Sequence, residues 1–490
     1  MEASYNIGAG GKHVHPNAYT IKQFRLFPHN IKFREKEADE EVTIGDVLNE
    51  AIQKVADSMD GGPSADIINA VQSFSFAESI TQPSIMGEVV IVDATNMIEN
   101  YRIQGGEKVR IIIQQNLPEE EKEINLTLYI SEVLGLTKGS IGSQSYKLTL
   151  VTKEHFKNAL FKLNEYFSGT AVNIVEGIIK SELGGTIAES SIPAPSAITS
   201  IIPEGTINPS LASSNKLSGI YPKLRPFDAI NWVLRNANDT LTPIFLYQTL
   251  QGFPGYTLKS YRQMIAEGVY SKYNNKPFGL TQTVEDEGFY DLQRTKIQDF
   301  TVNSYSDKMQ KARNGVYAAT AEEVSIDNKK HEKFTYTYTN PTKLNEFKPF
   351  TMTESLGGGF TRLNDKEFIN SRNYFINRDS DYHQNLATFL PQTVASYENL
   401  SDTSMTIQLF GDPHLSPGAV IELKMFKDQA KTAQGKDENL DNALLGGKYL
   451  VSAITHSFSG QGYIMSVNLL KDSSKINFEV REELWGKMDF

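Results

Sequence analysis

Two regions of this chain, 71–152 and 401–475, consist of short runs in which apolar and polar residues alternate. In the first region Val109, Ile111 and Ile113 fall on one face of such a run, because side chains along a strand point alternately to opposite faces. Runs of about four to eight such residues, bounded by turn residues, predict half-buried antiparallel strands. Each region therefore predicts a meander or small β-barrel.

The two regions also resemble one another. The segment GGEKVRIII (105–113) matches PGAVIELKM (417–425) as a glycine, a short gap and a valine-led strand. LYISEVLGL with SYKLTLV in the first region similarly matches YLVSAITHSF with GYIMSVNLL in the second. These matches predict one β-module used twice in the chain. Two unrelated meanders that share β-strand composition are the alternative.

The predicted fold class is α+β and β-rich, with two similar small antiparallel β-barrel domains of the tube type around an α/β or helical middle domain, plus insertions. RPFDAINWVLRNA predicts a short helix with Pro226 in its first turn. The expected divisions are an N-terminal arm (1–70) with a helix near 44–59, a first β-barrel (71–152), a middle domain (153–284) with a Pro/Ser-rich loop (186–218), a second β-barrel (285–323 plus 401–475), an insertion of uncertain structure (324–400) and a C-terminal tail (476–490).

Composition excludes several classes of function. The 490 residues include 48 basic and 59 acidic ones, so the net charge of 48 − 59 = −11 argues against a chain that coats nucleic acid. There is no cysteine, hence no disulfide and no thiol chemistry. We expect no signal peptide, no membrane span and no sequence-specific nucleic-acid binding, and therefore a soluble protein used without export by the usual route.

The segment GDPHLSPGAVIEL (411–423) is the strongest candidate for chemistry. Asp412 and His414, two residues apart, could bind a metal with a third ligand such as His456. However, Pro413 cannot donate a backbone hydrogen bond, and Asp-Pro followed by Ser-Pro-Gly is typical of turns. The favoured interpretation is a turn that leads into a strand, with Asp412 capping it.

Other motifs are weaker. KHVHP, with His13 and His15, is typical of a solvated arm rather than a metal site. The acidic run NLPEEEKEINL (116–126) is typical of a hairpin loop, although paired carboxylates could serve a glycosidase. ESLGGGFTR (354–362) lacks the lysine of a phosphate-binding loop. We therefore predict no catalytic, cofactor-binding or metal-binding residues and no cofactor.

Several blocks together carry a resemblance to a known family. They are residues 76–113, GDPHLSPGAVIEL followed by LLGGKYLVSAITHSFSGQGYIMSVNLLKDS, KLRPFDAINWVLRNA followed by IFLYQT, and a weaker match at ARNGVYAATAEEVSIDNKKHEKFTYTY. In this order they resemble the baseplate central hub protein of contractile-tailed, T-even-like bacteriophages, related in fold to the trimeric base of type VI secretion spikes. The chain departs from that family at 1–70, 186–218 and 324–400.

The resemblance implies a structural protein, not an enzyme. Such hubs are homotrimers whose two barrels per chain form a ring of six, adapting a sixfold tail tube to a threefold central spike around a channel for DNA. Implied partners are the tail tube protein, the central spike protein, and wedge and tape-measure proteins; the implied location is the virion tail baseplate, assembled in the host cytoplasm. A hub of a related injection or secretion system, or a tail-associated peptidoglycan-cleaving enzyme, are the alternatives.

Within this interpretation nine residues form a structural turn and strand motif. They are Gly105, Gly106, Asp412, Pro413, Pro417, Gly418, Tyr449, His456 and Tyr463. A further hypothesis places the acidic surplus along the channel, where it would repel passing DNA.

Overall fold

The fold was analysed in a computed structural model. It describes residues 17–28, 64–116, 121–139, 142–184, 187–190, 216–237, 241–275, 293–305, 307–337, 343–346, 372–377, 386–426, 442 and 444–475. The predicted helix near 44–59, the glycine-rich segment 354–362, most of the Pro/Ser-rich loop and the C-terminal tail lie outside these residues. Within them, no helix is both long and apolar enough to cross a bilayer.

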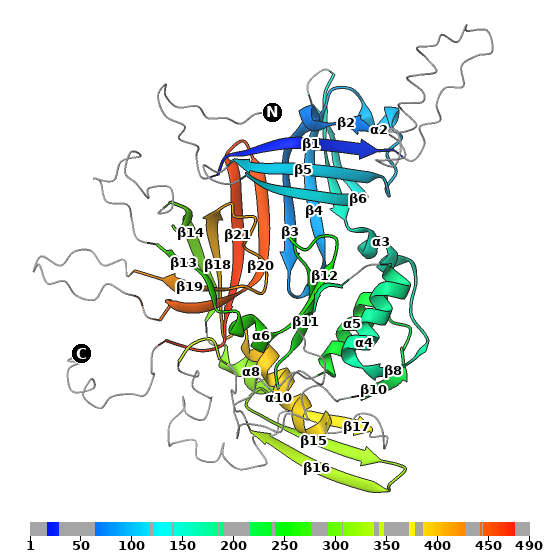
Figure 1. The fold of residues 1–490 in the computed structure, drawn as a ribbon, viewed down its shortest axis with the longest axis vertical. Helices are drawn as coiled ribbons and strands as arrows, with labels where there is room; N and C mark the ends of the chain where they lie inside the picture. The colour runs from blue at the N-terminus through cyan, green and yellow to red at the C-terminus, as the bar shows by residue number, and fades with distance from the viewer. Residues whose placement is uncertain are drawn as a thin grey trace, which may run out of the picture.

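The first β region forms five antiparallel strands in the order β3-β4-β7-β6-β5 (Figure 1). Their bounds are β3 (Val71–Ser79), β4 (Gln82–Asp93), β5 (Lys108–Asn116), β6 (Glu121–Lys138) and β7 (Gln144–Val151), with a short helix α2 (Met97–Asn100) between β4 and β5. Val109, Ile111 and Ile113 are buried on one face of β5, as their alternation predicts.

The second β region has the same strand order, β14-β18-β21-β20-β19. Its strands are β14 (Asp299–Tyr305), β18 (Thr403–Phe410), β19 (Val420–Lys424), β20 (Gly447–Ser459) and β21 (Gly462–Lys471). In each region, numbered along the chain, the first, second, fifth, fourth and third strands lie side by side. The similarity read from the sequence therefore corresponds to a repeated topology. We call 71–151 the first half and β14 with β18–β21 the second half.

The two halves join into one sheet because β20 pairs antiparallel with β3. We call this pairing the seam. The sheet is extended by β1 (Tyr19–Phe27), which pairs with β5, by β2 (Ala65–Asp66) beside β1, and by β13 (Val269–Asn274), which pairs with β19. A 3-10 turn, η1 (Ile68–Ala70), precedes β3. Among the described residues the path of paired strands stays open, so the sheets are β-rich and antiparallel without a closed barrel.

One apolar core runs through both halves. At the seam it is aromatic: the rings of Phe74 and Phe458 stack with centroids 4.6 Å apart, and those of Phe458 and Tyr463 at 4.3 Å. Phe76 and Tyr19 pack edge-on against Phe458. Because large rings from three strands and from β1 share this contact, separating the halves would expose a substantial apolar area.

A helical middle region lies between the halves along the chain and packs beside the first (Figure 1). It contains α3 (Lys153–Leu160), β8 (Tyr166–Thr170), α4 (Ala171–Ile178), the π-helical turn η2 (Ile179–Leu183), β9 (Ile187–Ser190), β10 (Lys216–Ile220), α5 (Pro226–Arg235), β11 (Ile244–Gln248), β12 (Tyr256–Ser260) and α6 (Tyr261–Ala266). Thr152 and Thr170 cap α3 and α4 by accepting backbone hydrogen bonds, and Gly184 ends η2 with φ +67°.

A small three-stranded sheet, in the order β16-β15-β17, takes two strands from the expected insertion (324–400) and one, β15, almost wholly from the stretch 285–323 that was assigned to the second β-barrel. Its elements are β15 (Ala318–Ser325), β16 (Lys330–Thr337) and β17 (Asn373–Asn377), with α10 (Leu386–Asn399) beside them and α8 (Lys308–Arg313) preceding β15. A buried ion pair between Lys311 and Asp402 ties α8 to the segment after α10. This ion pair therefore joins the two chain segments on either side of the insertion.

Candidate functional site

The seam and a glycine turn that occurs once in each half form the candidate site. In the first half, Gly106 N donates to Ile130 O at 2.6 Å, and Ile130 N donates to Glu107 O at 2.9 Å. In the second half, Gly418 N donates to Val451 O at 2.8 Å, and Val451 N donates to Ala419 O at 2.9 Å. The two glycines have φ +88° and φ +87°. The turn is therefore the same structure built twice, in a region of φ that favours glycine.

A bulge serine beside each turn repeats as well. Ser131 on β6 and Ser452 on β20 each lie where the register with the neighbouring strand shifts by one residue. Ser131 Oγ donates to Thr149 O at 3.1 Å, and Ser452 Oγ donates to Asn468 O at 3.0 Å. A bulge is a specific feature of a sheet rather than a defect. Equivalent hydrogen bonds at equivalent bulges therefore give a residue-by-residue match between the halves.

Asp412 caps its turn. Its Oδ1 accepts a hydrogen bond from His414 N at 3.0 Å, and its Oδ2 accepts one from the Tyr270 hydroxyl at 2.8 Å. Arg294 lies 3.6 Å from the same carboxylate. Burial and the nearby Asp412 charge raise the pKa of Tyr270 well above its usual range. Asp412, Tyr270 and Arg294 line a cavity of about 380 Å³, together with Tyr273.

The prolines of this segment are both buried beside Asp412 and Gly418. Pro413 O accepts a hydrogen bond from Gln251 Nε2 at 3.2 Å, so the turn is attached to the middle region. Pro417 immediately precedes the positive-φ glycine. In the first half Gly105 holds the position of Pro417, one residue before the turn glycine. Its N donates to Glu107 Oε2 at 2.9 Å, and its φ is +105°.

A buried polar network crosses the seam. His456 Nε2 lies 3.1 Å from Glu78 Oε1, and His456 Nδ1 lies 2.7 Å from the Tyr463 hydroxyl. Glu78 Oε2 accepts a hydrogen bond from Leu250 N at 2.8 Å. Burial, with the charges of Asp412 and Glu78, raises the pKa of Tyr463 well above its usual range. The network thus links β3, β20, β21 and the middle region through groups that water does not reach.

Tyr449, the remaining predicted residue, is buried on β20. Its hydroxyl donates to Leu445 O at 2.7 Å, and burial raises its pKa. The ammonium of Lys471 lies 4.7 Å from the ring centroid of Tyr449 and donates to Leu444 O at 2.8 Å. Burial lowers the pKa of Lys471 to about 8. These contacts close the strand ends of the second half.

The alternative chemistries find little geometric support. No three His, Asp or Glu side chains of the described residues gather in a position to hold a metal ion, Asp412, His414 and His456 included. The KHVHP motif lies outside the described residues. The acidic run 116–126 lies at the connection of β5 and β6, where Asn116 and Glu121 pair, but residues 121–126 belong to β6 itself rather than to a hairpin loop.

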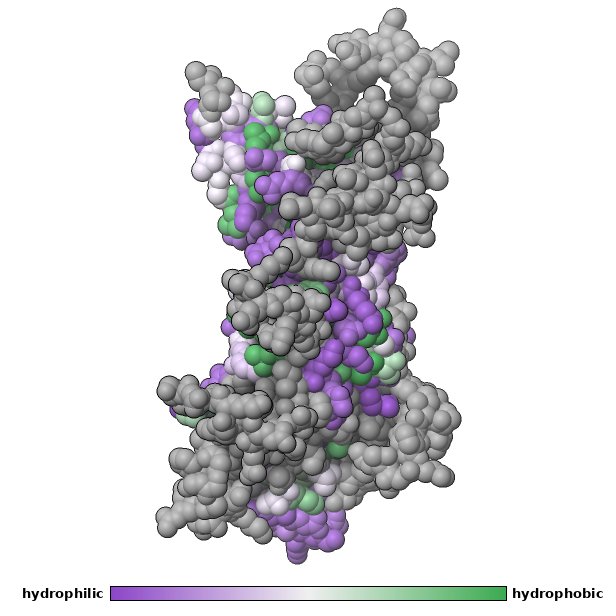
Figure 2. Space-filling model, turned by 90° about the vertical axis from the view of Figure 1, so that its left-hand side faces the viewer, coloured by the Kyte–Doolittle hydropathy of each residue, from purple (hydrophilic) through white to green (hydrophobic). Residues whose placement is uncertain are grey.

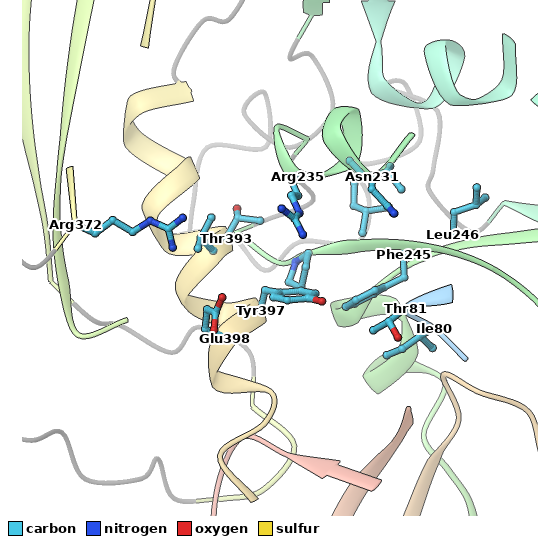
Figure 3. A pocket seen from close by; sticks show the side chains of 14 residues that line it. Ile80, Thr81, Asn231, Arg235, Phe245, Leu246, Arg372, Thr393, Tyr397 and Glu398 are labelled. Carbon is cyan, nitrogen blue, oxygen red and sulfur yellow. The ribbon is translucent and has the colours of Figure 1, made fainter. Parts of the chain in front are cut away.

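A second cavity, of about 210 Å³, lies between α5, β11 and α10 (Figure 3). Arg235 and Arg372 reach toward Thr393 from different elements, above an apolar floor that includes Phe245. The buried Thr393 hydroxyl has no hydrogen-bond partner in the part of the chain that the structure describes. Glu398, the acidic residue in the lining, accepts a hydrogen bond from Asn314 at 3.0 Å. This lining suits an anionic group rather than acid–base chemistry.

No protein-family model matches the chain, and no curated protein matches it in sequence. Solved structures do match. A tail protein from Neisseria meningitidis MC58 is 11% identical with a TM-score of 0.45, covering 84% of this chain and 94% of that one. A 43 kDa tail protein of prophage MuSo2 from Shewanella oneidensis is 9% identical with a TM-score of 0.43, covering 85% and 98%.

An E. coli component of the type VI secretion system, described as structurally similar to two bacteriophage T4 tail proteins, is 10% identical. Its TM-score is 0.35, covering 84% of this chain and 76% of that one. The proteins that match are thus phage tail proteins and a type VI secretion component, the groups to which the sequence resemblance points. Because every one of these TM-scores is below 0.5, the proposals below rest on the geometry of this chain.

Proposed function

We propose that this chain is the structural hub of a contractile phage tail baseplate, as its sequence resemblance implies. The observation that carries the proposal is the repeated strand order of the two halves, with the same glycine turn in each. A chain with two equivalent modules presents two similar surfaces at successive positions. Three such chains offer six similar positions while keeping threefold symmetry, which an adapter between a sixfold tube and a threefold spike requires.

In this proposal the two halves act as the two tube-type barrel modules, completed by contacts between chains. The homotrimeric ring surrounds a channel for DNA. One side binds the tail tube protein and the other the central spike protein, with wedge and tape-measure proteins as further partners. The place of action is the tail baseplate of the virion. A hub of a related contractile injection or secretion system needs the same ring, and its partner proteins distinguish it.

The test is the solution mass, measured by light scattering over a concentration series, alone and with a co-encoded spike protein. We expect a mass near three times 54.7 kDa, and a ring with a central hole in negative-stain images. A monomer under every condition overturns the proposal. His414→Ala and Asp412→Asn should keep the trimer, because both residues serve the local turn. Loss of bound metal or of an enzymatic turnover in these two variants would instead favour an active site.

A further inference from the structure

The seam inside one chain is a template for a contact between chains. Along the N-terminal part of β20, residues up to Leu450 pair with β19. Beyond the bulge at Ser452, the same edge of β20 is taken by β3 of the other half, from Ala453 opposite Ser79 to Phe458 opposite Phe74. One strand thus pairs first with its own module and then with the neighbouring module.

The equivalent strand of the first half lacks that second partner. On β6, residues up to Tyr129 pair with β5, as β20 pairs with β19. Beyond the bulge at Ser131, β6 continues to Lys138 with β7 on one edge, and no strand of the described residues pairs with its other edge. Leu136 in this stretch is 58% exposed. An open edge that carries exposed apolar residues is a pairing template.

The counterpart of β3 also lacks a partner. β14 is the edge strand of the second half. It pairs with β18 on one side, and no strand of the described residues pairs with its other side. Phe74 and Phe76 on β3 are buried at the seam, whereas Val302 on β14 is 36% exposed. The side of the molecule on which β14 lies in Figure 1 faces the viewer in Figure 2, where hydrophobic residues form small groups among hydrophilic ones.

The match between the halves supplies the register. Val133 and Ile454 are each the second residue after the bulge serine, and they pair with Leu148 and Val467. These two residues are therefore equivalent. In the first half, Leu148 pairs with Val89 on β4, and Val89 pairs with Phe74 on β3. In the second half, Val467 pairs with Ile407 on β18, and Ile407 pairs with Phe300 on β14. Phe300 thus stands where Phe74 stands in the seam, and Val302 stands where Phe76 does.

Counting along β6 completes the register. Lys138 pairs with Gln144 as Phe458 pairs with the equivalent Tyr463, so Lys138 belongs opposite Phe300. Antiparallel pairing then sets Leu136 opposite Val302. Each strand carries one extra residue near this pair, because the register shifts between Leu134 and Thr137 in β6 and between Val302 and Ser304 in β14. The two extra residues face each other, so the ladder is uninterrupted.

We propose that the C-terminal part of β6 (131–138) pairs antiparallel with β14 of a second copy of this chain, with Leu136 opposite Val302. This inference rests on the proposed trimer and identifies its contact. The partner is a second copy of this chain, because the two open edges are the counterparts of the two strands that pair in the seam: β6 corresponds to β20, and β14 corresponds to β3. The contact is head-to-tail, so repeating it propagates around a ring and leaves neither edge free when three copies close.

The test uses engineered disulfides, since the chain has no cysteine of its own. Directly opposed residues of an antiparallel pair have Cα atoms about 4.5–5.5 Å apart, within the range of a disulfide. The variant Leu136→Cys/Val302→Cys should give covalent dimers and trimers on a non-reducing gel after mild oxidation, and reducing agent should return it to monomer. The matched control, Leu160→Cys/Val302→Cys, places the first thiol on α3 at a residue that is more exposed (73%) than Leu136, and should stay monomeric on the gel.

A second variant guards against a misfolded cysteine pair. Val302→Asp sets a charge against the apolar Leu136 and should raise the apparent dissociation constant of the trimer about tenfold or more. A trimer in solution that neither cross-links through the 136–302 pair nor weakens in Val302→Asp overturns this contact and leaves the proposed function standing. A wild-type chain that is monomeric throughout overturns both. Cross-linking in the Leu160 control at the same rate refutes the register.

Discussion

Replacing Gly418 by alanine tests the geometry of the repeated turn. At φ +87° a residue with a Cβ loses about 1–2 kcal/mol. The added Cβ would also lie 2.5 Å from the Tyr247 hydroxyl and 3.3 Å from the Met264 methyl. Both side chains are buried, so moving them costs about 1–3 kcal/mol more. The expected loss of unfolding free energy is therefore about 2–5 kcal/mol.

Gly105→Ala is the matched control. Its φ of +105° also disfavours a side chain, but the nearest atoms to its added Cβ are backbone oxygens at 3.7 Å. We expect a loss of about 1–2 kcal/mol from backbone strain alone. Urea unfolding followed by tryptophan fluorescence and circular dichroism measures both variants. Equal losses would refute the role assigned to Tyr247, and a neutral Gly418→Ala would refute the turn geometry. Gly418→Val, which is bulkier, should abolish folding or trimer formation.

The remaining predictions concern buried polar groups. Glu78→Ala leaves Leu250 N and His456 without their partner and should lower the unfolding free energy by about 3–5 kcal/mol in urea; a change near zero would contradict the network. The pKa of Lys471 is about 8 in the folded chain, below the value of an unfolded lysine, so the folded state loses this proton first. Wild type should therefore gain stability relative to Lys471→Met between about pH 8 and 10, by about 1.4 kcal/mol per pH unit, and a constant difference over that range would refute it. Asp412→Asn weakens the cap and should lower the melting temperature slightly without changing the mass of the assembly.

Apart from β14, whose residues show no regular alternation of burial, the strands of both halves could be predicted from the sequence because alternation records which face is buried. The helix that begins at Pro226 was predicted from its own sequence, because proline favours the first turn, and the structure confirms it. The equivalence of Gly106 and Gly418 was also visible, since a turn with positive φ leaves a glycine in the sequence.

Other elements depend on contacts distant in the sequence. In the middle domain, expected to be helical or α/β, α3 ends at Leu160 and Tyr166–Thr170 is a strand, because β10 supplies a partner that the local sequence does not record. No strand was predicted in the N-terminal arm, yet β1 pairs with the edge of β5. Glu78 was not singled out: its importance comes from His456, 378 residues away, and no spacing within one segment reveals such a pair.

The seam within the chain and the proposed contact between chains differ in composition, in a way that the proposed assembly explains. The seam within the chain forms once, during folding, and carries large rings and a buried Glu–His–Tyr network. The edges proposed to meet between chains must stay soluble until a second copy arrives. At these edges Val302 accordingly stands at the position equivalent to Phe76, and Lys138 at the position equivalent to Phe458. These smaller or charged residues reduce the exposed apolar area while the strand register is kept. A duplicated module can thus fold on one version of the contact and assemble on the other.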